Sequence, residues 1–176
     1  TADTLAALRM ERERRDSIED SNYSFHQLGI TNRLDSSLAR EIDNVIDIGA
    51  GIEIGVAATK TFLGQMLAFY GLTLLFASHK HKRSTQEILD LSNDLRLVPK
   101  QLFELIRKHD DLSREMARLF VETKDVIFLG RGINYPIALE GALKLKEISY
   151  IHAQGYPAGE LKHGPIALLD QHVPVI

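Results

Sequence analysis

The chain lacks cysteine altogether among its 176 residues. Disulfide scaffolds, thiolate zinc sites and cysteine nucleophiles are therefore excluded from this segment. Positive charge is not in excess either, because 21 Lys and Arg residues stand against 24 Asp and Glu residues. This balance leaves no basic footprint for duplex DNA or an anionic membrane, so we expect no nucleic-acid partner.

Long apolar runs and a signal peptide are also missing. The most apolar stretch, residues 65–77, is shorter than the ~20 residues of a membrane span. The charged, helix-like opening has neither an apolar core nor a cleavage site. We therefore expect no membrane segment and a cytoplasmic location, which the absence of cysteine also fits. With 44% hydrophobic and 26% charged residues, the composition is that of a globular protein with a sizeable core.

What is present is the alternation of strands, glycine turns and helices that is typical of an α/β fold with parallel sheets. Residues 44–48 and 125–129 are the clearest strand candidates, and a glycine-containing turn follows each. A weaker strand pattern covers residues 26–31. A helix expected over residues 56–79 is apolar almost all round, which predicts a central, buried position. Residues 154–165 are expected to form a loop because glycine and proline punctuate them.

The pattern over residues 84–121 is helical with frequent charges. Ser84 and Glu87 have the spacing of a capping box, which predicts a helix start there. Pro99 and His109 predict two interruptions, so this region is expected to hold more than one helix.

One helical segment carries charged side chains that fall on a single face. Glu140, Lys144 and Glu147 follow one another at spacings of four and three residues. On a buried face, a carboxylate there can move a proton next to a carbonyl, and the ammonium can stabilise the enolate that develops. The alternative is an ion-pair ladder on a solvated face, and the pattern alone leaves both open.

Glycine-containing segments offer three further candidates. The turn at 130–135 resembles a dinucleotide fingerprint, but Tyr135 stands at its third glycine position, so we expect no nicotinamide or flavin cofactor. That turn either faces a ligand or is a plain tight turn. His163 lies between glycine-permitted turns and suits acid–base work, whereas a single Glu160–His163 pair assigns no metal. Thr59, before a helix start, either faces a polar ligand or caps the helix.

Three segments, in this order along the chain, resemble the glutamine–fructose-6-phosphate aminotransferase family, also called glucosamine-6-phosphate synthases. The helix that follows the family's phosphate loop is matched by TADTLAAL (1–8). The end of its first sugar-isomerase (SIS) unit is matched by GAGIEIGVAATKTF (49–62). Its second SIS unit is matched by LGRGINYPIALEGALKLKEISYIHAQGYPAGELKHGPIALLD (129–170), in which KLKE and GELKHGP are the most specific parts.

The resemblance implies three-layer αβα SIS units of the flavodoxin-like kind, with parallel sheets. Residues 1–83 then form the C-terminal part of a first SIS unit, residues 84–109 a helical connector, and residues 110–176 the N-terminal part of a second SIS unit. No cofactor is implied. The implied partners are a sugar phosphate, a glutaminase domain that this chain does not contain, and a second copy in a homodimer.

The family's reaction assigns roles to the candidate residues. Ammonia derived from glutamine attacks C2 of open-chain fructose 6-phosphate, and a proton then moves from C1 to C2 to give glucosamine 6-phosphate. By resemblance, Glu147 carries that proton, Lys144 stabilises enolate charge, and His163 assists ring opening from across a dimer interface. The substrate-binding positions implied by the resemblance are Thr1, which matches the last hydroxyl of the phosphate loop, and Val56 and Ala58, which line the sugar pocket.

Departures from the family keep other functions open. The Ser-x-Ser-Gly phosphate loop and the family's Schiff-base lysine lie outside this sequence, and both ends predict a segment of a longer protein. Ala58 stands where the family usually has serine. Residues 16–27 are polar where the family has an apolar lead-in to a strand, so we expect them to be irregular. A non-catalytic SIS module that binds sugar phosphates and an inactive remnant are the alternatives.

Overall fold

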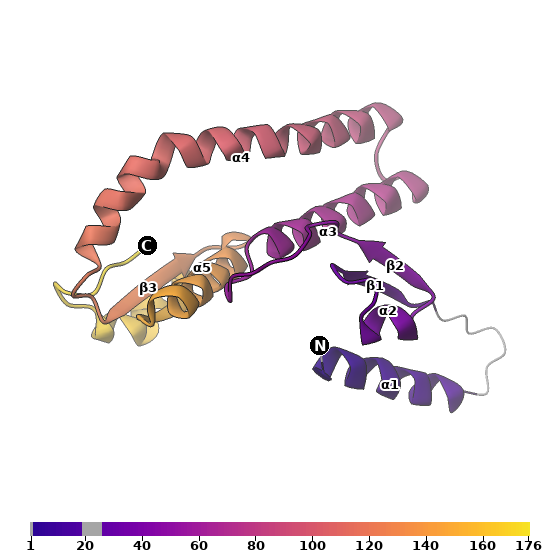
Figure 1. Ribbon diagram of the computed structural model, residues 1–176, viewed down its shortest axis with the longest axis horizontal. Coiled ribbons are helices and arrows are strands. Elements are labelled where there is room, and N and C mark those ends of the chain that lie inside the picture. The colour runs from indigo at the N-terminus through magenta and orange to yellow at the C-terminus, as the bar shows by residue number, and fades with distance from the viewer. Residues whose placement is uncertain (1, 19–25) are drawn as a thin grey trace. The chain divides into compact units, whose positions relative to one another are not determined.

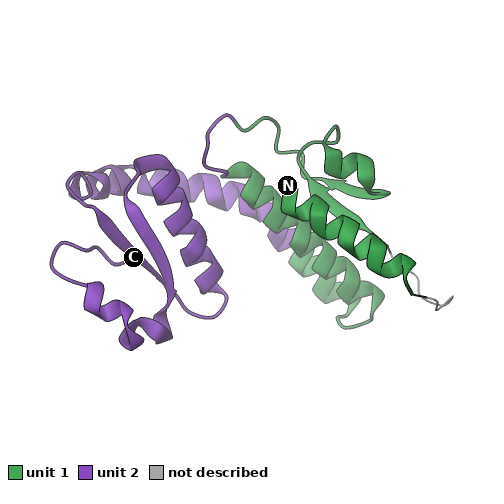
Figure 2. Cartoon of the chain, turned by 90° about the horizontal axis from the view of Figure 1, so that it is seen from below, with its two compact units in different colours: residues 1–53, 59–92 green, residues 54–58, 93–176 purple. Residues whose placement is uncertain are grey.

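The computed structural model describes residues 2–18 and 26–176. Their elements (Figure 1) divide into two compact units (Figure 2): unit 1 holds the described residues up to 53 together with 59–92, and unit 2 holds 54–58 and 93–176. The expected three-part division at residues 83 and 109 concerns the family's SIS units and stays a prediction. Thr1 and most of the stretch expected to be irregular lie outside the described residues.

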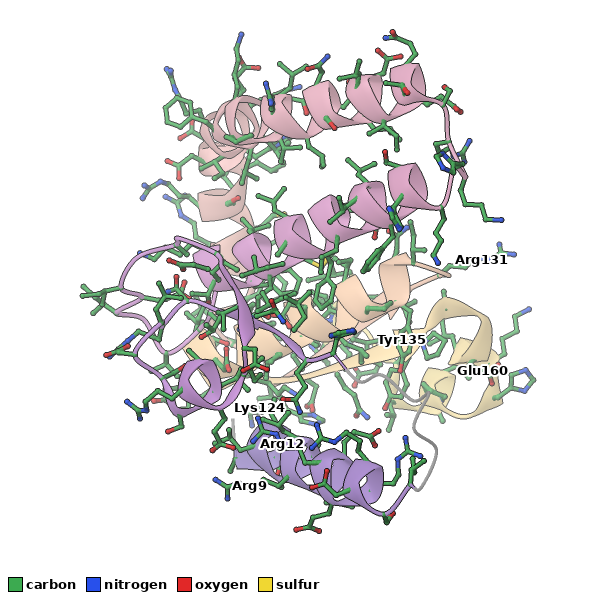
Figure 3. All side chains as sticks on the ribbon, turned by 90° about the vertical axis from the view of Figure 1, so that its right-hand side faces the viewer. Arg9, Arg12, Lys124, Arg131, Tyr135 and Glu160 are labelled. Atoms are coloured by element: carbon green, nitrogen blue, oxygen red, sulfur yellow. The ribbon has the colours of Figure 1, made fainter. Side chains whose placement is uncertain are left out.

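Unit 1 contains a two-stranded parallel sheet and helices. Its elements are α1 (Ala2–Asp16), β1 (Leu28–Thr31), α2 (Ser37–Glu41), β2 (Asn44–Asp47), α3 (Lys60–His79) and the start of α4 (Thr85–Leu119). In the sheet, Leu28 lies opposite Asn44. Arg9 and Arg12 of α1 (Figure 3) reach the carboxylate of Glu41 at the end of α2, at 3.0 and 3.5 Å. The strands predicted over 26–31 and 44–48 are thus confirmed.

Unit 2 contains a second parallel pair of strands with one helix packed on it. Its elements after α4 are β3 (Asp125–Gly130), α5 (Asn134–Ser149), β4 (His152–Pro157) and the 3-10 helices η1 (Ala158–His163) and η2 (Pro165–Leu168). Asp125 lies opposite His152 at one end of the sheet and Gly130 opposite Pro157 at the other. Strand, turn, helix and parallel strand follow one another, which confirms the predicted α/β class.

The loop predicted over residues 154–165 is wrong in its first part. Residues 152–157 are strand β4, because β3 offers a parallel partner along its whole length. Gly155 is required for packing rather than for a turn: a Cβ there would lie 3.0 Å from the Leu139 Cα of α5. Glycine usually indicates a loop in a sequence, but Gly155 lies inside β4 because α5 crosses this strand too closely for a larger residue.

The tightest packing lies between α5 and the sheet of unit 2. Val126 is 1% exposed and packs with Ala142 and Ala153. Small side chains at these contacts let the helix backbone approach the strands. In the described part of the chain the other buried hydrophobic residues are Ile127 and Ala138. The core of unit 2 therefore lies where α5 meets β3 and β4.

The buried position predicted for the long apolar helix is wrong. None of the residues of α3 is buried, and Phe69, Tyr70, Leu75 and Phe76 are largely exposed. At 20 residues, α3 is also long and apolar enough to cross a membrane by length and composition. The expectation drawn from residues 65–77 missed this because α3 extends beyond that run at both ends and includes Phe62 and Leu63.

The predicted interruptions of the region 84–121 are also wrong. Residues Thr85–Leu119 form the single helix α4 (Figure 1), with Pro99 inside it. Two new helix ends would leave several N–H and C=O groups unpaired, whereas Pro99 removes one hydrogen bond. The predicted start is confirmed: the Ser84 N–H donates to the Glu87 carboxylate (2.8 Å), and the Glu87 N–H donates to the Ser84 hydroxyl (3.2 Å).

Gly130 provides a test of the turn that joins β3 to α5. A Cβ at this position would lie 2.3 Å from the Asn134 carbonyl oxygen, so we expect Gly130→Ala to lower the free energy of unfolding by ~1–3 kcal/mol. Gly71→Ala is the control, because a Cβ at this helical position meets nothing within 4 Å and is expected to stabilise by up to ~1 kcal/mol. Urea denaturation measures both, and equal effects would contradict the argument.

Candidate functional site

The charged residues predicted to share one face of α5 do so in the structure. The Lys144 ammonium lies 2.8 Å from the Glu147 carboxylate and 3.3 Å from that of Glu140. The spacings of three and four residues place both carboxylates within reach of one lysine. The three side chains are only 20–27% exposed, so this is no fully solvated ladder.

The carboxylates of Glu140 and Glu147 stabilise the protonated form of Lys144. The hydrogen bond to Glu147 and, after it, the interactions with Glu140 raise the pKa of Lys144 above its ordinary value, although partial burial works against them. The amine therefore stays protonated at neutral pH. It can act as a cation and hydrogen-bond donor, and it is not available there as a neutral nucleophile.

Close packing holds α5, and with it the charged group, against the sheet. Ala138 and Ala142 are buried, and a Cβ at Gly141 would lie 3.0 Å from the Phe128 ring. The helix ends at Tyr150, which has a left-handed backbone with φ of 63°. The rigid position of α5 fixes where Lys144 and Glu147 can act.

The other predicted site residues that the structure describes have no hydrogen bond or ion pair with this group. His163 is the last residue of η1 and is exposed. In the described residues no hydrogen bond or ion pair joins it to Lys144 or Glu147. Val56 is 87% exposed in the loop before α3, and Ala58 is half-buried there. Thr1 lies outside the described residues. The structure thus brings together Lys144 and Glu147 and leaves the remaining roles as predictions.

The loop before α3 contains a functional group that the sequence analysis did not single out. The Glu53 carboxylate accepts hydrogen bonds from the Thr59 N–H (2.8 Å), the Thr59 hydroxyl (3.1 Å), the Lys60 N–H (3.0 Å) and the Thr61 hydroxyl. Hydrogen bonds from Thr61, then from Thr59, lower the pKa of Glu53 to about 2. Thr59 does not cap α3 with its side chain; Glu53 takes that role from six residues upstream.

Comparisons with known proteins agree with one another. A family model described as SIS domain matches residues 119–176. Two relatives called glutamine–fructose-6-phosphate aminotransferase [isomerizing], from Nostoc and Synechocystis, are 57% and 58% identical over the whole of this chain. Over its whole length the chain is thus similar to a segment of glutamine–fructose-6-phosphate aminotransferases. It spans only 28% of the length of these two relatives.

A solved structure places the chain within the aminotransferase. The C-terminal domain of glucosamine-fructose-6-phosphate aminotransferase from Francisella tularensis is 44% identical, with a TM-score of 0.89. The match covers 99% of this chain and 46% of that one. The chain therefore corresponds to part of the aminotransferase's C-terminal isomerase region, which confirms the resemblance and the SIS fold class.

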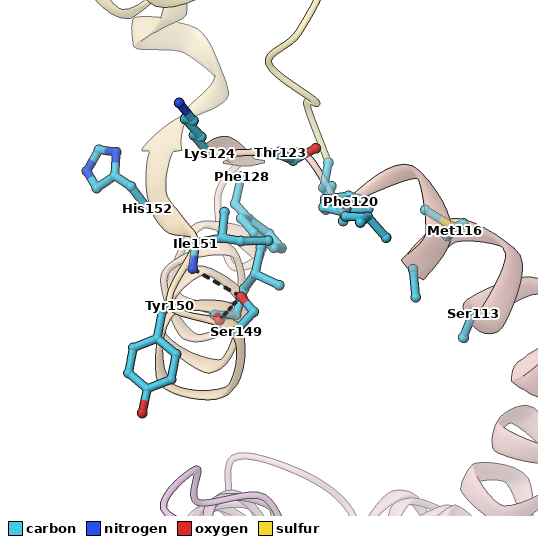
Figure 4. A pocket seen from close by; sticks show the side chains of 14 residues that line it. Ser113, Met116, Phe120, Thr123, Lys124, Phe128, Ser149, Tyr150, Ile151 and His152 are labelled. Carbon is cyan, nitrogen blue, oxygen red and sulfur yellow. Dashed lines mark hydrogen bonds between the residues drawn. The ribbon is translucent and has the colours of Figure 1, made fainter.

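A cavity in unit 2 lies away from the charged group of this aminotransferase segment. It measures about 890 Å³ and is mainly apolar, with Met116, Phe120, Phe128 and Ile151 on its walls (Figure 4). Lys144, Glu147 and His163 are not among its lining residues. None of the residues predicted to act on the sugar lines this cavity, so it is not the candidate site.

The remaining candidates are metal-ligating side chains and the turn after β3. Residues 2–18 and 26–176 contain no group of three or more His, Asp or Glu side chains that could hold a metal ion. At the turn after β3, the backbone of α5 lies so close to Gly130 that a Cβ would collide with it, while the Arg131 side chain is exposed. This turn is therefore tight in the structure.

Proposed function

We propose that this chain supplies isomerase residues to a glutamine–fructose-6-phosphate aminotransferase. One observation carries the proposal: a part-buried carboxylate, Glu147, is hydrogen-bonded to an ammonium, Lys144, on a helix locked to a parallel sheet. This is the acceptor and cation pair that proton transfer next to a carbonyl needs. The names of the relatives supply the substrate, fructose 6-phosphate, and the nitrogen source, glutamine.

The proposed chemistry balances in three steps. Ammonia adds to the C2 carbonyl of open-chain fructose 6-phosphate, and water leaves to give an imine. Glu147 removes one proton from C1 and the imine nitrogen takes up a proton, which gives an enamine that still carries the C1 hydroxyl. Glu147 returns its proton to C2 while the C1 hydroxyl loses its own proton, so that C1 becomes the aldehyde of glucosamine 6-phosphate and the amine stays on C2. Lys144 stabilises the negative charge that develops on the C1 oxygen.

The remaining predicted roles complete the proposal. Thr1 contacts the phosphate, Val56 and Ala58 line the sugar pocket, and His163 assists ring opening in the site of a second copy. The exposed position of His163 leaves its side chain accessible to a second copy, which supports a role in a homodimer. A glutaminase domain delivers the ammonia. We infer a cytoplasmic location, with the apolar surface of α3 covered by protein rather than by lipid.

The test is formation of glucosamine 6-phosphate by the complete protein. With fructose 6-phosphate and glutamine, or with fructose 6-phosphate and ammonium, we expect product that NMR or mass spectrometry identifies. Saturable binding of fructose 6-phosphate without any product would instead support the non-catalytic SIS module. Absence of both binding and product would support the inactive remnant.

Ala58 provides a test of the sugar pocket. A serine hydroxyl at this position can donate one more hydrogen bond to the sugar, which is worth ~0.5–1.5 kcal/mol. We therefore expect Ala58→Ser to lower the KM for fructose 6-phosphate by about two- to tenfold, measured from initial rates. Ala57→Ser is the neighbouring control. An equal change in KM for both variants would show that Ala58 does not line the pocket.

A further inference from the structure

Residues 54–58 form a loop whose two ends are held together by the Glu53 carboxylate. We call these ends, Glu53 on one side and residues 59–61 on the other, the neck of the loop. Glu53, directly before the loop, accepts the backbone N–H groups of Thr59 and Lys60, directly after it, at 2.8 and 3.0 Å. Its other oxygen accepts the Thr61 hydroxyl. Both oxygens are therefore used, and the two ends of the loop are held together.

Further hydrogen bonds fasten the chain on either side of this neck. The Lys60 ammonium donates to the Ile52 carbonyl at 2.6 Å. The Asn32 amide donates to the Gly51 carbonyl (2.6 Å) and accepts from the Ala50 N–H (2.9 Å). Asn32 follows β1, and the segment it holds follows β2. In parallel α/β sheets, loops at these carboxyl ends of the strands are where ligands bind.

The loop itself presents side chains outward while its neck is closed. Ile54 and Val56 are 95% and 87% exposed. Exposed side chains of a loop lose conformational freedom when a ligand orders them, and a closed neck lowers that cost in advance. The negative charge of Glu53 is meanwhile satisfied by four donors at the N-terminus of α3, where a helix favours an anion. The carboxylate therefore presents little free charge to an anionic sugar phosphate.

The geometry points to Glu53 as a positioning residue, which fixes the loop Ile54–Ala58 for binding the sugar phosphate without touching the sugar phosphate itself. This inference rests on the proposed function, because Val56 and Ala58 are sugar-pocket residues only there. Glu53 is distinct from Glu147: the first sets the affinity for the sugar, and the second moves the proton.

The experiment uses the complete protein and two variants of the neck. Glu53→Gln keeps the size of the side chain but replaces one acceptor oxygen with a donor, and Thr61→Val removes one donor while it keeps the branched shape. We expect Glu53→Gln to raise the KM for fructose 6-phosphate about tenfold, with kcat within about twofold of the wild type. Thr61→Val is expected to give a smaller rise. Glu115→Gln, on the exposed surface of α4, is the control and is expected to change neither constant.

Hydrogen exchange and calorimetry separate positioning from simple stabilisation. In Glu53→Gln, amides of residues 54–62 are expected to exchange about tenfold faster, while those of β3 stay unchanged. An unchanged KM would overturn the inference. So would equal losses of kcat and folded protein, which a purely structural cap predicts, and Thr61→Val decides the matter if Glu53→Gln does not fold.

The binding measurement also distinguishes this inference from the proposed function. Calorimetric titration with fructose 6-phosphate requires no turnover. In a Glu147→Gln background, we expect Glu53→Gln to weaken binding about tenfold. Retained turnover in Glu147→Gln with this weakened binding would refute the proton-transfer role and leave the positioning role standing. Unchanged binding would refute the positioning role whatever the turnover.

Discussion

Glu147→Gln in the complete protein is expected to lower kcat for glucosamine 6-phosphate formation by about 10²–10⁴-fold, which is the usual contribution of a positioned general base. Glutamine has the same size and can still accept a hydrogen bond from Lys144, so α5 should keep its packing. The amide cannot take a proton from C1. Initial rates with saturating fructose 6-phosphate measure the effect.

Two controls make the Glu147 result specific. Glu122→Gln changes an exposed carboxyl group after α4 and should leave kcat within twofold. Hydrolysis of glutamine by the glutaminase domain should continue in Glu147→Gln, because that reaction uses other residues. Exchange of the C1 proton with deuterated solvent, followed by NMR, should slow in parallel with product formation. Turnover at the wild-type rate would eliminate Glu147 as the base.

Lys144→Met is expected to lower kcat by about 10²–10³-fold. Methionine fills a similar volume but removes the cation that the structure places 2.8 Å from Glu147 and 3.3 Å from Glu140. Two part-buried carboxylates then lie near one another without the charge that offset them. Enolate charge in the reaction also loses its stabilising ammonium. Steady-state kinetics on the complete protein measure this loss.

The matched control for Lys144 lies two residues away on the same helix. Lys146 is exposed, and Lys146→Met should leave kcat within about twofold. Circular dichroism should show the same helix content in both variants. Comparable losses in Lys144→Met and Lys146→Met would show that total charge on α5, rather than the ammonium between the carboxylates, matters for turnover.

Local patterns were sufficient for the elements whose signals lie within a few residues. β3 was predicted because five consecutive residues, Asp125 to Leu129, read as a buried strand. The capping box at Ser84 and Glu87 contains its own hydrogen-bonding partners, and it formed as predicted. β4 was missed because its strand character depends on pairing with β3 and on the approach of Leu139 to Gly155. The predicted helix start at Pro99 is wrong because the length of a helix depends on more than one residue's preference.

For the candidate site too, the sequence predicts which side chains share a face, and the packing decides how buried they are. The shared face of Glu140, Lys144 and Glu147 follows from the helical repeat, so the sequence by itself determined that they meet. Only the tertiary structure decided that the group is part-buried, since α5 had first to pack on β3 and β4. The role of Glu53 was likewise hidden, because its partners become neighbours only when the loop closes. Periodicity is a property of a single segment, whereas burial and loop closure depend on contacts between segments that local sequence patterns do not reveal.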